Sequence, residues 1–152
     1  MKVYTKRAAK DYPEYGISRG DTYYEWCHYR QKPTKSKTPP KESDLTADPD
    51  MAEAMRVFEG LDQSASYDCE DVRGMISTLE DCRDSLQGRL DGVPESLQDS
   101  SPLNEKIEQL EETISSMESL ADDLEQEDDS DDDSEEGDGT CGADRIEEAR
   151  AF

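Results

Sequence analysis

Apolar residues are scarce in this chain. They make up 32% of its 152 residues, and charged residues make up 38%. Ordinary globular domains are about 45–50% apolar. Low hydrophobicity together with a formal net charge of −23 is typical of chains that are partly disordered. The composition therefore predicts a few small ordered pieces, in which each helix buries one stripe, and no large core.

Long apolar runs are missing as well. No stretch of about eighteen apolar residues occurs, so no transmembrane helix and no membrane partner are expected. The first twelve residues have no apolar core of the kind that secretory signals carry, which predicts that the protein stays in the cytoplasm. The four cysteines are scattered without framework spacing, so free thiols are expected in a reducing compartment.

The sequence also lacks recognisable catalytic and metal-binding motifs. His28 is the only histidine, and Cys27 precedes it. Adjacent residues on a strand point to opposite faces, which argues against a Cys–His dyad, and a zinc site would need two further ligands. The C-terminal aspartates lack the central glycine and the flanking helices of an EF-hand loop. We therefore expect no catalytic residue, no metal and no cofactor, and predict a non-enzymatic protein.

What the chain does have is charge of opposite sign in two places. Residues 1–41 hold ten Lys or Arg against four Asp or Glu, a net charge of +6. Residues 42–152 hold seven against 36, a net charge of −29. Six of the seven Tyr and the single Trp lie in the basic part. The pattern indicates a small basic, aromatic head followed by a long acidic body.

The head, 1–41, is predicted to be β-rich. Two runs, at 3–5 and 22–27, carry β-branched and aromatic residues, and turn signals lie between them. The segment 32–41 is basic and holds three prolines. It is predicted to be an extended arm that continues neither a strand nor a helix.

Helices are predicted beyond the head. A short one is expected at 48–62, and two longer segments within 68–126 carry apolar residues at spacings of three and four. A breaker at Gly92 to Pro94 favours an antiparallel helical hairpin of coiled-coil type, and a parallel homodimer of one or both segments is the competing arrangement. The seam is predicted to contain Val72, Met75, Leu79, Cys82, Leu86, Leu103, Ile107, Leu110, Ile114, Met117, Ala121 and Leu124.

The C-terminal part is predicted to be a tail. Residues 127–143 form an acidic run that like-charge repulsion should keep disordered. Residues 144–152 regain helix propensity and end on an aromatic residue, with no visible partner in the chain. Ile146 and Phe152 are therefore candidates for a docking tail. The predicted fold class is mainly α, with a small β-rich N-terminal module, a helical hairpin and a disordered acidic tail.

Several binding functions fit this organisation. The head fits a nucleic-acid surface, with cations meeting phosphates and aromatic rings stacking on bases, although the same rings also suit the core of a small sheet. The acidic body fits a basic protein partner, a DNA mimic that inhibits a DNA-binding enzyme, or a tail that modulates the head. The candidate contacts in the head are Lys6, Arg7, Lys10, Arg19, Tyr23, Tyr24, Trp26, Arg30, Lys32, Lys35 and Lys37.

The chain also carries a family resemblance over most of 1–126. The motifs are RAAKDYP at 7–13, GISRGDTYYEW at 16–26, SKTPP at 36–40, GRLDGVPESLQ at 88–98 and KIEQLEE at 106–112. They resemble a group of small phage and prophage proteins with a basic aromatic head and a helical hairpin, to which no activity is assigned. The resemblance implies a viral origin and a setting in the host cytoplasm. The leading hypothesis is a phage-encoded adaptor or accessory protein that binds another protein.

Overall fold

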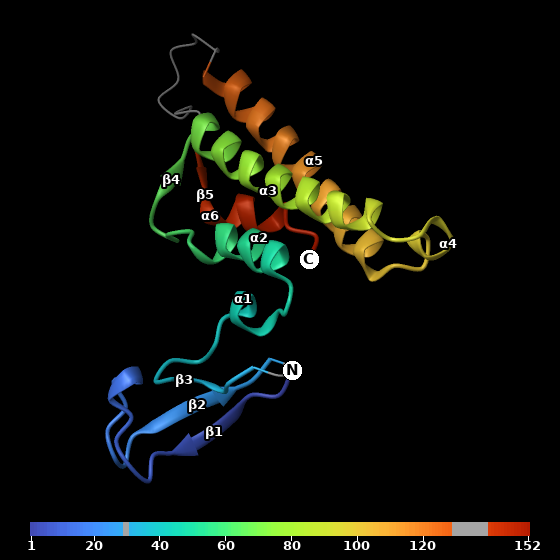
Figure 1. Cartoon of the computed structure of the whole chain (residues 1–152). Coiled ribbons are helices and arrows are strands. Elements are labelled where there is room, and N and C mark those ends of the chain that lie inside the picture. The colour runs from blue at the N-terminus through green and yellow to red at the C-terminus, as the bar shows by residue number, and fades with distance from the viewer. Residues whose placement is uncertain (29–30, 129–139) are drawn as a thin grey trace. The chain divides into compact units, whose positions relative to one another are not determined.

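The computed structural model describes residues 1–28, 31–128 and 140–152 (Figure 1). The chain divides into two units, Met1–Met55 and Arg56–Phe152, and each is described by itself. Most of the described residues are helical, and the N-terminal unit contains a small β-rich module, as predicted. Its strands form a three-stranded antiparallel sheet, of which the third strand was not predicted. No helix of the described part combines the length and the apolar character that crossing a membrane requires.

The N-terminal unit is built on a sheet with the strand order β1-β2-β3. Its strands are β1 at Tyr4–Arg7, β2 at Thr22–Trp26 and β3 at Thr34–Ser36, and neighbouring strands are antiparallel. Threonine and aromatic residues recur in them because such side chains pack well on a pleated surface. Each strand therefore forms where the sequence supplies these residue types.

A folded connection between β1 and β2 supplies the small core of this sheet. The amide of Ala8 donates to the carbonyl of Asp21 at 2.8 Å, which continues the β1–β2 pairing. The connection contains the 3-10 helix η1, Pro13–Tyr15, which ends at Gly16 with a φ of +62°, a left-handed conformation that favours glycine. Ala8, Ile17 and Tyr23 form a buried cluster, and the partly buried Tyr12 packs against it.

The prediction of a Pro-rich arm at 32–41 is wrong in one respect. Thr34–Ser36 forms β3 and pairs with β2, with Lys35 opposite Glu25. A proline removes only its own N–H, and Pro33 precedes the strand, so the three following residues remain able to pair at the edge of the sheet. The prolines at 39 and 40 lie beyond the strand, where they do not interfere.

Two helices follow the sheet. α1, Glu42–Leu45, is a single turn that the sequence did not predict. α2, Pro49–Glu59, lies within the predicted range of 48–62 and runs through the division between the two units. Asp48 caps it, because its carboxylate accepts a hydrogen bond from the amide of Asp50 at 3.2 Å.

The C-terminal unit contains a helical hairpin. α3 is Cys69–Asp91 and α5 is Pro102–Asp128. Arg73, near the start of α3, forms an ion pair with Glu125, near the end of α5, so the two packed helices are antiparallel. The connection includes the one-turn helix α4, Glu95–Gln98. Figure 1 shows α3 and α5 lying side by side.

The first turn of α3 is fixed by a capping box. The carboxylate of Asp68 accepts a hydrogen bond from the amide of Asp71 at 2.8 Å, and the carboxylate of Asp71 accepts one from the amide of Asp68 at 3.3 Å. Both amides would otherwise lack a partner within the helix. The negative side chains also suit the positive end of the helix dipole.

The hairpin buries an apolar stripe on each helix. On α3 the structure departs from the predicted seam at one position, because Ile76 is buried and Met75 is half-buried. Residue 76 lies four positions after Val72 and three before Leu79, so helical spacing allows it on the stripe as readily as residue 75. The other buried positions are Val72, Leu79, Cys82, Leu86 and Leu90 on α3, and Ile107, Leu110, Thr113, Ile114, Met117, Leu120, Ala121 and Leu124 on α5.

Beyond α5, part of the predicted tail is ordered. Residues 129–139, most of the predicted disordered run at 127–143, lie outside the described residues. Within the described part, β5, Cys141–Gly142, pairs with β4, Ser66–Tyr67, and α6 begins at Ala143. The prediction of disorder is therefore wrong at both ends of the run. Residues 127–128 belong to the last turn of α5, and 141–143 are ordered because Cys141 and Ala143 are small apolar side chains that become buried.

Candidate binding surfaces

The two units differ sharply in charge. The N-terminal unit, residues 1–55, has ten basic and nine acidic residues, a net charge of +1. The C-terminal unit, residues 56–152, has seven basic and 31 acidic residues, a net charge of −24. The basic excess of residues 1–41 is thus offset within its own unit by five carboxylates in 42–55. Only the C-terminal unit therefore carries a large net charge.

On one face of the sheet, a carboxylate lies between two lysines. Glu25 accepts a hydrogen bond from Lys6, and the Lys35 Nζ lies 3.7 Å from its other oxygen. The hydrogen bond to Glu25 raises the pKa of Lys6. The Lys35 Nζ also lies 4.0 Å from the centroid of the Tyr12 ring. Two of the predicted nucleic-acid contacts, Lys6 and Lys35, are therefore bound to protein groups.

A third predicted contact is also paired. The Nζ of Lys37 lies 2.9 Å from a carboxylate oxygen of Asp21, and the same oxygen accepts a hydrogen bond from the amide of Ser18 at 3.0 Å. The hydrogen bond from Lys37, followed by that from Ser18, lowers the pKa of Asp21. This arrangement ties the turn before β2 to the residue after β3.

The aromatic residues of the head divide into buried and exposed sets. Tyr23 and Trp26 are 4% and 5% exposed, so their faces are not free for stacking on bases, and burial raises the pKa of the Tyr23 hydroxyl. Tyr24 is half-buried. Among the described residues of the head, the exposed rings are Tyr4 and Tyr15, at 53% and 39%, which the sequence did not single out.

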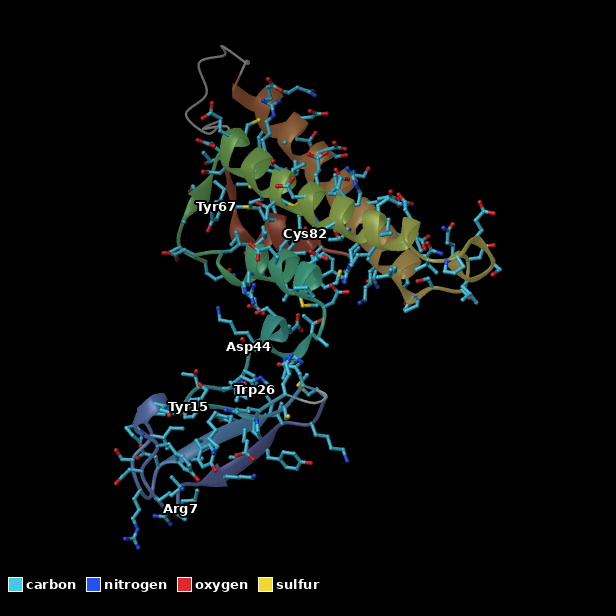
Figure 2. The ribbon with its side chains drawn as sticks, in the orientation of Figure 1. Arg7, Tyr15, Trp26, Asp44, Tyr67 and Cys82 are labelled. Carbon is cyan, nitrogen blue, oxygen red and sulfur yellow. The ribbon has the colours of Figure 1, made fainter. Side chains whose placement is uncertain are left out.

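The remaining predicted contacts lie around the sheet. Arg7 donates through Nε to the carbonyl of Gly20 at 3.1 Å, and the Lys10 Nζ lies 5.5 Å from the Tyr12 ring. Arg19 and Lys32 are exposed. Arg30 lies outside the described residues. Figure 2 shows Arg7 and Trp26 toward opposite ends of the sheet, so the predicted contacts do not gather in one place.

A pocket of about 240 Å³ lies at the end of the sheet where β1 begins and β2 ends. The side chain of Cys27 in its wall donates to the carbonyls of His28 and Gln31, at 3.1 and 2.9 Å. A thiol carries one proton, so it donates to one of these two carbonyls at a time. The pocket is lined by Lys2, Tyr4, Glu25, Trp26, Cys27 and Pro33.

His28 faces a different group. Its Nε2 lies 3.0 Å from the carbonyl of Asp44 in α1. A carbonyl only accepts, so Nε2 carries the proton in this contact. Cys27 and His28 thus each bind backbone carbonyls. Within 1–28, 31–128 and 140–152, no three His, Cys, Asp or Glu side chains are placed to hold a metal ion.

The hairpin carries a second, larger hollow of about 440 Å³ between α3 and α5. Its apolar part is formed by Ile76 and Ala121, and its polar part by Arg73, Glu118 and Asp122. Arg73 donates to a carboxylate oxygen of Glu125 at 2.6 Å, a bond that raises the pKa of Arg73. The hollow, here called the hairpin groove, thus combines an apolar floor with carboxylates.

The predicted docking tail is part of the folded unit. Ile146 is fully buried, and Phe152 meets Phe58 edge-to-face with ring centroids 5.7 Å apart. The guanidinium of Arg150 lies 5.0 Å from the Phe152 ring and 5.8 Å from the Phe58 ring. The prediction of Ile146 and Phe152 as free docking residues is wrong, because both side chains find apolar partners within the C-terminal unit.

Comparison with known proteins adds no relative. No family model, no curated protein and no solved structure matches the chain.

Proposed function

We propose that the chain is a non-enzymatic binding protein whose C-terminal unit engages a basic surface of a protein partner. One observation carries the proposal: in the C-terminal unit, the described residues 56–128 and 140–152 hold 24 carboxylates and only seven cations. One-to-one pairing would leave 17 of these carboxylates without a cation. Such a density of like charge opposes folding through self-repulsion, so it is costly to maintain unless a ligand of opposite charge uses it.

The hairpin groove is the proposed centre of this surface. Ile76 and Ala121 offer an apolar floor for the methylene stem of an arginine or lysine, and Glu118 and Asp122 offer carboxylates for its charged end. Arg73, which lines the groove, already forms an ion pair with a carboxylate, that of Glu125. The partner is therefore proposed to insert a basic side chain between α3 and α5.

A charge-reversal pair tests the groove. Glu118→Lys together with Asp122→Lys should weaken binding of a fluorescent nona-arginine peptide by at least about tenfold at physiological salt, or about 1.4 kcal/mol. The matched control is Glu95→Lys with Asp99→Lys, which changes the net charge equally at exposed positions beside α4. The control should weaken binding by about threefold or less.

Two outcomes would contradict the proposal. Equal weakening by both double variants would mean that the peptide senses only the overall charge, and the groove would then have no special role. No weakening by either would remove the acidic surface as the binding site. Circular dichroism at 222 nm must show that both variants keep their helices, and fluorescence anisotropy supplies the affinities.

We also propose a coiled-coil seam for the hairpin, since its interior repeats at seven residues. Val72, Leu79 and Leu86 are spaced by seven on α3, and Leu110, Met117 and Leu124 are spaced by seven on α5, and all six are buried. Leu110→Pro should abolish most of the helical circular dichroism signal, because proline breaks the middle of α5. An unchanged spectrum would contradict this packing.

A nucleic-acid function for the head is the second candidate. The observation that favours it is Tyr4, which is exposed and has the Lys6 Nζ 5.6 Å from its ring centroid. A labelled single-stranded oligonucleotide should then bind at low salt and lose affinity in Tyr4→Ala, with Tyr15→Ala as the control. Failure of single-stranded and duplex probes to bind would remove this candidate.

We also propose where the protein acts and in what role. The resemblance to phage and prophage proteins favours a protein made and used in a host cytoplasm, as an adaptor or accessory factor. A partner that normally binds DNA would make the acidic unit a DNA mimic. Duplex DNA should then compete with the chain for that partner, whereas a partner that does not bind DNA would be indifferent to the competitor.

A further inference from the structure

The strand β1 has an outer edge without a neighbour in the described structure. The sheet order places β1 at one side, with β2 as its only strand partner among the described residues. All four residues of β1 are exposed. An edge strand of this kind presents backbone groups to which another extended chain can bind.

The pairing shows which backbone groups of β1 face outward. The amide of Ala8 donates to Asp21 on the β2 side. In an antiparallel ladder the direction alternates from residue to residue, so Lys6 and Tyr4 also use their amides toward β2. The amides and carbonyls of Thr5 and Arg7 therefore point away from β2, toward the unpaired edge.

The side chains along this edge are divided by chemistry. Lys6 and Arg7 make its C-terminal half basic, whereas Val3 and Tyr4, 38% and 53% exposed, make its N-terminal half apolar. Few large apolar side chains are this exposed anywhere in the described structure. These two adjacent side chains offer an added strand an apolar surface to pack against.

The pocket of about 240 Å³ opens beside the apolar half. Tyr4 belongs both to the edge and to the pocket wall, together with Trp26 and Pro33. Its volume is sufficient for one large apolar side chain. Strand addition uses main-chain hydrogen bonds for affinity and such pockets, filled by alternate side chains, for specificity.

From these observations we propose that an extended, acidic segment of a partner protein adds to β1 as a fourth, antiparallel strand. Its acidic N-terminal half pairs with Arg7 on one face and brings a second carboxylate to Lys6, which also holds Glu25, on the other. Its apolar C-terminal half lies along Val3 and Tyr4. One apolar side chain of the segment enters the pocket beside Trp26. This site is separate from the hairpin groove and stands whether or not that groove binds a basic partner.

Charge selects the partner segment over a second copy of the chain. Antiparallel pairing of two β1 strands would bring two sets of Lys6 and Arg7 to one short interface. Lysines on an edge strand oppose such self-pairing. An acidic segment instead gains from the same charges, because like charges opposite each other destabilise a strand pair and opposite charges stabilise it.

The test uses the full chain, labelled with nitrogen-15, and an acetylated, amidated peptide of sequence Ser-Thr-Glu-Glu-Val-Phe-Val-Ser. Its adjacent Glu residues lie on opposite faces of the added strand, as Lys6 and Arg7 do on β1. Saturating peptide should slow hydrogen exchange of the Thr5 and Arg7 amides by at least about tenfold, since exchange then requires the added strand to leave. The Lys6 amide, already directed at β2, should change less. A peptide with Lys in place of both Glu is the control, and it should bind at least about tenfold more weakly.

A proline at the edge gives an independent readout. Thr5→Pro removes an outward amide and leaves the pairing with β2 intact, since prolines are tolerated on edge strands where the N–H faces solvent. It should weaken peptide binding about tenfold, whereas the matched Thr5→Val variant should stay within about twofold. Trp26 fluorescence and the amide spectrum show whether each variant keeps its sheet.

Several results would overturn the proposal. One is no binding of the acidic peptide to the wild-type chain at millimolar concentration. Another is exchange protection confined to β3 or to the C-terminal unit. A third is a folded Thr5→Pro variant that binds as tightly as Thr5→Val. Sedimentation showing a dimer that Thr5→Pro dissociates would make a second copy the occupant and would equally refute an acidic partner segment.

Discussion

Truncation of Ile146 is the sharpest test of how the C-terminal unit is built. The side chain is fully buried in α6, in a segment that sequence reasoning treats as a free tail. Ile146→Ala removes three carbon atoms, worth about 2.4 kcal/mol at about 0.8 kcal/mol per buried methylene. A cavity left behind adds to this, so the free energy of unfolding should fall by about 2–5 kcal/mol.

The matched control is Leu97→Ala in α4. Leu97 is 55% exposed, and its truncation should change the free energy of unfolding by no more than about 0.5 kcal/mol. Urea titration followed by circular dichroism at 222 nm reports on both variants, because the C-terminal unit holds most of the helix. If Ile146→Ala were no more destabilising than Leu97→Ala, the packing of α6 into this unit would be refuted.

Three further predictions concern individual groups and overall charge. Thr113→Val should cost about 1 kcal/mol, because Thr113 Oγ1 accepts a hydrogen bond from the Ala151 amide at 3.0 Å, and hydrogen exchange at Ala151 should accelerate. Raising NaCl from 10 to 150 mM should raise the melting temperature of the C-terminal unit by screening repulsion among its carboxylates, and a fall would contradict the assigned net charge. Because the folded-state pKa of Asp21 is lowered, its contribution to stability is present above its ordinary pKa of 3.8 and is lost as the pH falls through the lowered value. Acid unfolding of the sheet, followed by Trp26 fluorescence, should therefore depend less on pH in Asp21→Asn than in the wild type. Equal unfolding profiles would exclude this contribution.

Local patterns in the sequence were enough to predict the first two strands of the sheet and the hairpin helices. Thr22 to Trp26 is a run rich in aromatic residues, and the apolar residues from Leu103 to Leu124 follow a helical spacing, so each element is visible without knowledge of its neighbours. Which of Met75 and Ile76 is buried cannot be predicted from such a local pattern. Both fit the spacing, and only the packed partner helix decides which is buried.

The larger errors concern contacts between distant residues. Ile146 and Phe152 look unpartnered in the sequence because Phe58 precedes Phe152 by 94 positions, and no local pattern joins them. β3 was missed for a related reason, since three residues between prolines carry a weak strand signal until β2 supplies the pairing. The aromatic residues of the head were hard to predict for the same reason. Tyr4 and Tyr23 lie on the same face of the sheet, and Tyr12, from the connection between β1 and β2, packs against Tyr23 while Tyr4 stays exposed.

Division of the chain by its fold also changes what its charge means. A boundary at residue 41 gives a strongly basic head, whereas the unit 1–55 has a net charge of only +1. A unit so close to neutral has little long-range field, and charges separated by more than about 8 Å are screened at physiological salt. Recognition at β1 must therefore depend on contacts that form after encounter, through backbone pairing and the pocket at Tyr4.

The unit 56–152, with a net charge of −24, can steer a basic partner from a distance. Binding at the hairpin groove should consequently weaken steeply with salt and mainly through a slower association rate, whereas binding at β1 should depend less on salt. Identical salt dependence at the two surfaces would show that long-range charge, and not local structure, governs both.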